Sequence, residues 1–105
     1  MSTARINEDN LVYGKVSADK GDAAATLDMR TSEQTNVWNT PLTANRAVTL
    51  TTTGAFEGAK FRVVRTAAAT GAFNLTVAGK NLAAGQWADV EYDGAAWFLT
   101  AFGSL

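Results

Sequence analysis

Residues 86–102 read QWADVEYDGAAWFLTAF, and this stretch predicts a β-hairpin. Apolar and polar residues alternate on both sides of Asp93-Gly94, which is the pattern of strands buried on one face. Asp tolerates and Gly prefers the positive φ of a two-residue turn, so this dipeptide is a strong hairpin signal. The alternation also places Trp97 and Phe98 on opposite faces of the second strand.

The same alternation recurs upstream, in short segments separated by glycines and polar turn residues. We expect strands within residues 11–16, 25–29, 35–38, 46–51, 60–64 and 73–77. Residues 22–30 contain an alanine run that would permit a helical turn, but they lack a helical apolar stripe, so a strand is favoured. This spacing predicts an all-β fold, an antiparallel β-sandwich or barrel of about seven to eight short strands.

The composition excludes several kinds of chemistry. The 105 residues include no Cys and no His, and nine Lys and Arg oppose ten Asp and Glu, for a net charge of −1. We therefore expect no disulfide, no cofactor or metal site, no enzymatic activity and no nucleic-acid partner. The N-terminal residues lack the apolar core of a signal peptide, and no segment is long and apolar enough to span a membrane.

The expected core contains few bulky apolar residues, because twenty of the residues in the chain are Ala and fourteen are Thr. Small domains without disulfides or structural metal ions often gain stability by oligomerising, so we expect a homo-oligomer. The residues predicted to fill the core of one subunit are Val48, Leu50, Phe61, Val63, Phe73, Leu75, Val77, Val90, Tyr92 and Leu99.

Charged residues alternate along two of the expected strands. The acidic set is Asp89, Glu91 and Asp93, and the basic set is Lys60, Arg62 and Arg65. Carboxylates at alternate strand positions are about 6.6–7 Å apart, which is too far for all three to bind one Ca²⁺ ion. Pairing between acidic and basic strands, of one subunit or of neighbouring subunits, is a better interpretation than a Ca²⁺ site, and a solvated charged face is the default.

The large aromatic residues cannot all face one small core. We therefore predict that some of them contact another subunit or a partner, since aromatic residues are common anchors of protein interfaces. The predicted interface residues are Leu11, Val12, Tyr13, Trp38, Trp87, Phe98 and Phe102.

The chain from about residue 38 to 105 resembles a small β module of tailed-bacteriophage virion proteins, including C-terminal regions of tail fibres and tailspikes. The resemblance is carried by residues 39–50 (NTPLTANRAVTL), 58–66 (GAKFRVVRT) and 84–97 (AGQWADVEYDGAAW), and by the terminal Gly103-Ser104-Leu105. It does not cover the first 37 residues. It implies a trimer and a role in virion assembly or attachment, without a catalytic motif.

A single module in a chain this short is most similar to a capsid decoration protein, which binds the shell many times as a compact oligomer. We expect residues 1–13 to form an N-terminal arm or edge strand and residues 14–105 to form one all-β domain. The expected partner is the major capsid protein or another virion protein, and the expected location is the virion, after synthesis in the host cytoplasm. The alternative is a tail-fibre or tailspike tip that binds host glycans; a small hydrolase would need a nucleophile and base that the sequence does not offer.

Overall fold

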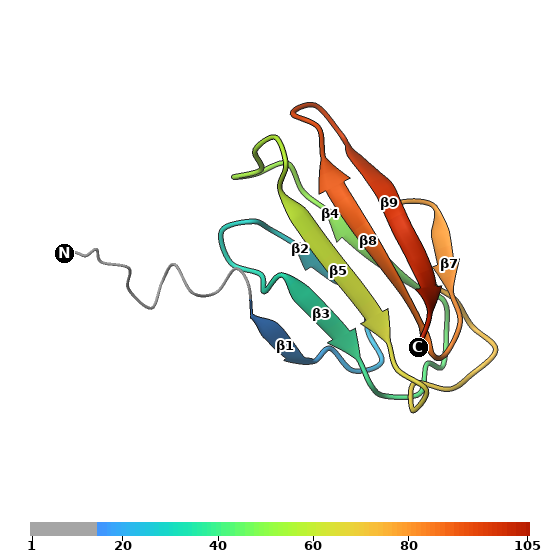
Figure 1. Ribbon diagram of the computed structural model, residues 1–105. Helices are drawn as coiled ribbons and strands as arrows, with labels where there is room; N and C mark the ends of the chain where they lie inside the picture. The colour runs from blue at the N-terminus through green and yellow to red at the C-terminus, as the bar shows by residue number, and fades with distance from the viewer. Residues whose placement is uncertain (1–14) are drawn as a thin grey trace.

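The computed structural model describes residues 15–105, and every regular element in that range is a β-strand (Figure 1). The strands are β1 (Val16–Asp19), β2 (Ala25–Leu27), β3 (Thr35–Trp38), β4 (Arg46–Leu50), β5 (Lys60–Arg65), β6 (Leu75–Val77), β7 (Lys80–Leu82), β8 (Gln86–Tyr92) and β9 (Trp97–Ser104). This part of the chain has no helix of the length and apolar character needed to cross a membrane. The all-β prediction is confirmed here, with slightly more strands than expected.

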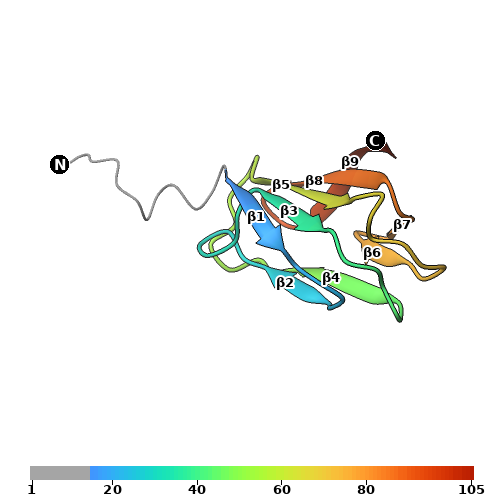
Figure 2. The same cartoon turned by 90° about the horizontal axis from the view of Figure 1, so that it is seen from below.

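The strands form two sheets that face each other as a sandwich (Figure 2). One sheet has five strands in the order β1-β3-β5-β8-β9, and the other has four in the order β2-β4-β6-β7. The two sheets do not close into a barrel. The sandwich is therefore the correct choice between the two architectures that the sequence left open.

The prediction of antiparallel sheets is wrong for the first half of the domain. From β1 to β6 the chain alternates between the two sheets, and a strand that returns to its own sheet runs in its earlier direction. The pairs β1–β3, β3–β5, β2–β4 and β4–β6 are consequently parallel, whereas β5–β8, β6–β7 and β8–β9 are antiparallel. Alternating hydrophobicity reports which face is buried and leaves the partner and its direction open.

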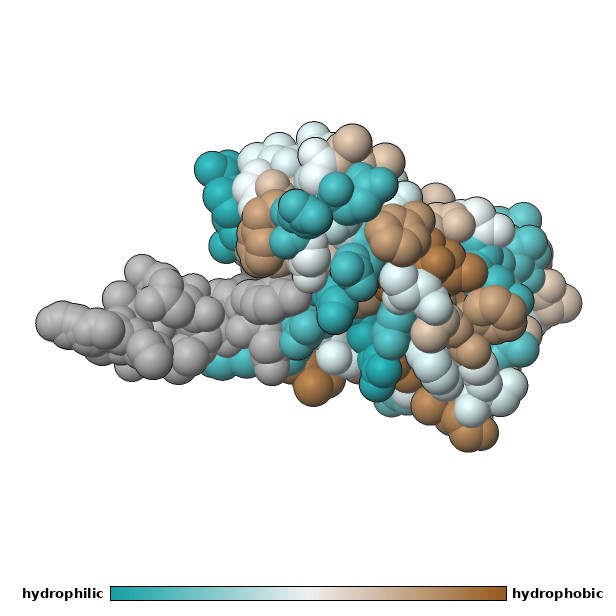
Figure 3. Space-filling model, turned by 45° about the horizontal axis from the view of Figure 1, so that its top comes forward, coloured by the Kyte–Doolittle hydropathy of each residue, from teal (hydrophilic) through white to brown (hydrophobic). Residues whose placement is uncertain are grey.

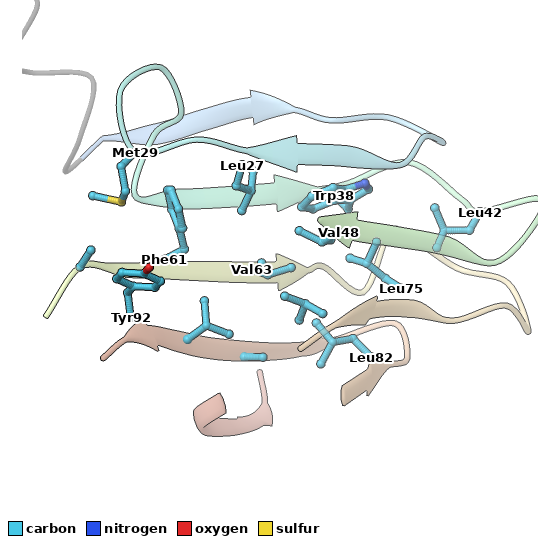
Figure 4. Close-up of a cluster of buried hydrophobic side chains, with 14 residues drawn as sticks. Leu27, Met29, Trp38, Leu42, Val48, Phe61, Val63, Leu75, Leu82 and Tyr92 are labelled. Atoms are coloured by element: carbon cyan, nitrogen blue, oxygen red, sulfur yellow. The ribbon is translucent and has the colours of Figure 1, made fainter. Parts of the chain in front are cut away.

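Apolar side chains from both sheets fill the space between them (Figure 4). Of the predicted core residues, Val48, Phe61, Val63, Leu75, Val77, Val90 and Tyr92 are buried. Leu50 and Leu99 are partly buried against the same cluster. Phe73 was predicted in the core but is 41% exposed, because it lies in the loop before β6 and outside the hydrogen-bonded ladder.

Trp38 corrects another prediction, that of an interface residue. Its side chain is completely buried at the end of β3, and its indole Nε1 donates a hydrogen bond of 2.9 Å to the carbonyl of Ala23. It belongs to the core of this subunit. Leu11, Val12 and Tyr13 lie outside the described residues, so their predicted role stays a prediction.

The predicted hairpin is present, but residues 93–96 join β8 to β9, so the connection has four residues rather than the predicted two, and Asp93 does not adopt a positive φ. The Asp93 carboxylate accepts hydrogen bonds of 2.8 Å from the N–H groups of Ala95 and Ala96, and Gly94 has a φ of +98°. These bonds lower the pKa of Asp93, that from Ala96 most strongly. Asp93 is therefore a turn residue rather than a member of a charged site.

A bulge interrupts the alternation along β9. Asp89 is opposite Ala101, but Val90 is opposite Leu99, so Thr100 is an extra residue in β9. An extra residue reverses the facing pattern beyond it. Phe102 is opposite the buried Ala88 and is therefore on the inner side of the sheet, whereas strict alternation would place it on the same side as Phe98.

Candidate functional site

The outer face of the five-stranded sheet is the surface turned away from the core on β5, β8 and β9. It forms because the intervening residues of β5 and β8 are completely or almost completely buried. The side chains on this outer face are Lys60, Arg62, Trp87, Asp89, Glu91 and Phe98. All of them lie in stretches that the sequence analysis singled out.

Two cross-strand ion pairs run across β5 and β8. Arg62 is in register with Asp89 and donates two hydrogen bonds to its carboxylate, from Nε at 2.7 Å and from Nη2 at 2.9 Å. Lys60 is in register with Glu91, and its Nζ lies 3.9 Å from Oε1. The bonds to Asp89 raise the pKa of Arg62. The predicted pairing of acidic and basic strands is confirmed for these two pairs.

Arg65, the third basic residue, has a different environment. It is completely buried at the end of β5, and its burial lowers the pKa of the guanidinium. The group donates hydrogen bonds of 2.6–3.1 Å to backbone carbonyls instead of carboxylates. These carbonyls belong to Ala69, Gly71, Phe73 and Leu82. Arg65 therefore holds the β5–β6 loop against β7 and contributes nothing to the outer face.

Trp87 lies against the neighbouring strand β9. A Cβ atom at Gly103, its cross-strand partner, would lie only 3.1 Å from the indole Cζ2. The Cζ atom of Arg62 is 4.9 Å from the centre of the indole ring, within the range of a cation–π contact. Trp87 is thus held on the outer face between the side chain of Arg62 and the backbone of Gly103, and it remains partly exposed.

The two predicted phenylalanines are both exposed, on different sides of the sheet. Phe98 is 44% exposed on the outer face, opposite Glu91. Phe102 is 56% exposed on the inner side, where Lys80 Nζ lies 4.0 Å from its ring centre. The core of the subunit therefore leaves both rings uncovered, whereas it buries Trp38, and the predicted interface role of Phe98 and Phe102 stays a prediction.

A concavity of about 510 Å³ opens on the outer face beside the ion pairs. It is lined by Gln34, Thr35, Lys60, Phe61, Arg62, Asp89, Glu91 and Thr100. Sequence reasoning missed Gln34, Thr35 and Thr100, because their place depends on β3 joining β5 and on the bulge in β9. The lining presents hydroxyl, amide, carboxylate and cationic groups, which together can bind a polar, hydroxyl-rich ligand.

Asp89 and Glu91 are each paired with a cation, and no group of three or more acidic side chains within residues 15–105 is placed to hold a metal ion.

Comparison with known proteins relates residues 17–99, which hold β1 to β8 and the start of β9, to a family described as the GW (Gly-Tryp) dipeptide domain. The chain belongs to the GW dipeptide domain family. No curated protein and no solved structure matches it.

This GW domain has no Gly-Trp dipeptide anywhere in its sequence. Gly85-Gln86-Trp87 comes close to the dipeptide, with one residue between Gly and Trp. Gly85 has a φ of +81° at the turn into β8, and Trp87 is the aromatic residue of the outer face. The position that most nearly corresponds to the family's name therefore lies at the candidate site.

Proposed function

We propose that this GW domain is a non-catalytic attachment module of a bacteriophage virion, acting as a capsid decoration protein. In this role it binds the major capsid protein or another virion protein as a homo-oligomer, with a trimer as the expected assembly. The observation that carries the proposal is the outer face of the five-stranded sheet, where Trp87, Arg62 and Phe98 are presented together.

The chemistry of the outer face supports binding over catalysis. Aromatic and arginine side chains are enriched at interface hot spots. The two hydrogen bonds to Asp89 and the packing against Gly103 hold Arg62 and Trp87 in place before a partner arrives. A preordered surface loses little side-chain entropy on binding. The stretches that resemble phage modules, residues 58–66 and 84–97, contain most of this face.

The proposed role also includes the N-terminal residues. Residues 1–13 lie outside the described residues, and the proposal gives them the predicted role of an arm that contacts the capsid, as short segments can add to the edge of a partner's sheet. Many such contacts across the shell would stabilise it mechanically, with no reaction.

Two observations favour the second candidate function, recognition of bacterial surface glycans by a tail-fibre or tailspike tip. GW domains are typically bacterial cell-wall binding modules. The concavity on the outer face is lined by hydroxyl, amide, carboxylate and cationic groups that can bind sugar hydroxyls, and Trp87 lies against Arg62, one of the lining residues. An aromatic ring next to polar groups suits the apolar face and the hydroxyls of a sugar.

The location of the protein in purified particles tests the proposal. Quantitative mass spectrometry of intact particles should give a copy number that scales with the major capsid protein, and labelled antibodies should decorate the shell. A copy number that scales with tail-fibre subunits, with label confined to the tail, contradicts the decoration role and supports the second candidate.

Variants of the outer face then test the surface itself. Trp87→Ala combined with Arg62→Glu should abolish rebinding of the protein to stripped shells. Phe56→Ala is the matched control, because Phe56 is 55% exposed in a loop outside the strands and should bind as the parent does. If the double variant instead lost binding to sedimented bacterial cell walls or to a glycan array, and still bound shells as the parent does, the outer face would be a glycan-binding site, as the second candidate function requires.

A further inference from the structure

Strand β9 forms one edge of the five-stranded sheet. One side of its backbone is paired with β8, and no described strand pairs with the other side (Figures 1 and 2). A free strand edge presents a row of backbone donors and acceptors that can template pairing with another chain. Soluble proteins usually protect such an edge with charges, a proline, a β-bulge or a very short strand.

The β9 edge has one of these protections, the bulge at Thr100, and lacks the others. Its eight residues, WFLTAFGS, contain no charged residue and no proline, and the bulge at Thr100 is its only interruption. The opposite edge of the same sheet is β1, which has only four residues and ends at Asp19, with Lys15 and Lys20 beside it. The two edges therefore differ in how strongly they resist pairing.

Exposed apolar side chains gather along β9. Phe98 projects on the outer face and Phe102 on the inner side, so the free edge has an exposed ring on both sides of the sheet. Leu105, the residue after the strand, is 72% exposed. Figure 3 shows the molecule with its top turned forward, where hydrophobic and hydrophilic residues are mixed over the surface.

We propose that the β9 edge pairs with the β9 edge of a second copy of this chain, antiparallel and across a two-fold axis. Such a contact joins two five-stranded sheets into one continuous sheet, and the same residues contribute from both copies. Self-pairing brings identical segments together, so a strand with no charge meets no like-charge repulsion. Antiparallel pairing of two β1 edges in full register would instead bring Lys15 of one copy close to Lys20 of the other.

We expect the partner at this edge to be a second copy of the chain, because β9 has no charged residue and two such edges do not repel each other. The proposal rests on the homo-oligomer in the proposed function and names its contact. It differs from the expected trimer, since a two-fold pair gives a dimer or an even-numbered assembly.

Sedimentation equilibrium of the full chain over a wide dilution series tests the pairing. We expect a monomer–dimer equilibrium for the parent. Phe102→Glu should weaken it by about tenfold or more, because the pair would then bury two carboxylates. Lys80 lies against residue 102 and can pair with the new carboxylate, so the subunit should remain folded. Phe56→Glu, at a position with nearly the same exposure, should leave the equilibrium unchanged.

Single cysteines give a second readout that does not depend on a disruptive variant. The chain has no Cys, so Phe98→Cys, Thr100→Cys, Phe102→Cys and Ser104→Cys each introduce one thiol on β9. Under mild oxidation, positions near the two-fold axis should form disulfide-linked dimers, and Phe56→Cys should not.

Three outcomes would overturn the proposal: a parent that stays monomeric throughout the series, a trimer, or a Phe56→Cys variant that cross-links as fast as the β9 variants. A monomer that still binds shells would refute the β9 contact alone. A dimer that binds no virion component would support the contact and refute the proposed function.

Discussion

The indole ring of Trp87 covers Gly103 across the β8–β9 ladder so closely that a single added methyl group would contact it at 3.1 Å. Gly103 is in an extended strand and is not among the glycines with positive φ. Its role is therefore to leave space for the ring rather than to adopt an unusual backbone conformation. This pair of residues sets the shape of the outer face.

Replacing Gly103 by Val should displace the ring of Trp87 towards solvent. Val suits the backbone of a strand, so we expect a local change without unfolding. The indole N–H signal of Trp87 in a two-dimensional NMR spectrum should shift, while that of the buried Trp38 stays in place. Ser104→Val, at the exposed neighbouring position, should leave both signals unchanged. An unmoved Trp87 signal in Gly103→Val would refute the close contact.

The Arg62–Asp89 pair should contribute little to folding despite its two short hydrogen bonds. The side chains are 51% and 25% exposed, so water and salt screen their attraction. A double-mutant cycle with Arg62→Ala and Asp89→Ala, measured by urea denaturation, should give a coupling of about 0.2–1 kcal/mol that falls with added salt. A coupling several times larger would mean that the pair is a stability element rather than part of a surface.

Arg65 should behave in the opposite way. Arg65→Lys keeps the charge but cannot reach all four carbonyls, so buried acceptors lose their donors. We expect a loss of about 2–4 kcal/mol in the free energy of unfolding, measured as a lower urea midpoint. Arg30→Lys is the control, since its side chain is 70% exposed and the loss there should be negligible. Equal midpoints for Arg65→Lys and the parent would contradict the role of Arg65 as the anchor of the loop.

Low pH should lower the stability of the fold at the end of the sandwich where Asp22 contacts the β3–β4 loop. Hydrogen bonds from Arg46 and Thr43 lower the pKa of Asp22 to about 2. The pKa of an Asp carboxyl in the unfolded chain is about 3.9, so the ionised Asp22 carboxylate stabilises the fold at higher pH. This contribution is lost as the pH falls towards 2 and the carboxylate is protonated.

Asp22→Asn should therefore destabilise the protein near neutral pH, and its difference from the parent should shrink between about pH 4 and pH 2. Urea midpoints across this range measure the effect. Thr53→Ala, a neutral change at an exposed loop residue, should keep a constant offset from the parent. A difference for Asp22→Asn that does not change with pH would disprove the stabilising role of the carboxylate.

Local patterns in the sequence were sufficient to predict most of the strands and the hairpin, but β7 was not expected, and β1 (Val16–Asp19) starts where the expected strand at residues 11–16 ends. Strand β3 has the predicted bounds, stopping before Pro41, and β8 and β9 flank the predicted Asp93-Gly94 turn. The pairs of Lys60 with Glu91 and of Arg62 with Asp89 were also accessible, because charge alternation along a strand already restricts which face each residue occupies.

The errors share one cause, which is that a periodic pattern contains no information on distant partners. Phe73 fits the alternation of its segment but lies before the start of β6. Trp38 has the aromatic character of an interface residue, yet the carbonyl of Ala23 satisfies its indole N–H inside the core. Phe102 lies on the opposite side of the sheet from the one that alternation predicts, because β9 contains a single extra residue.

The sequence by itself determined that residues 15–105 are all-β, that the chain has no cysteine or histidine chemistry, and which residues of β5 and β8 avoid water. Those properties follow from composition and from the two-residue period of a strand, both of which are local. Only the tertiary structure decided that the sheets are mixed, that Arg65 is enclosed by carbonyls, and that Trp87 shares an open face with Arg62. Strand order and register arise from packing between segments far apart in the chain, where side-chain volume and hydrogen-bond satisfaction select one arrangement from many that fit the local pattern.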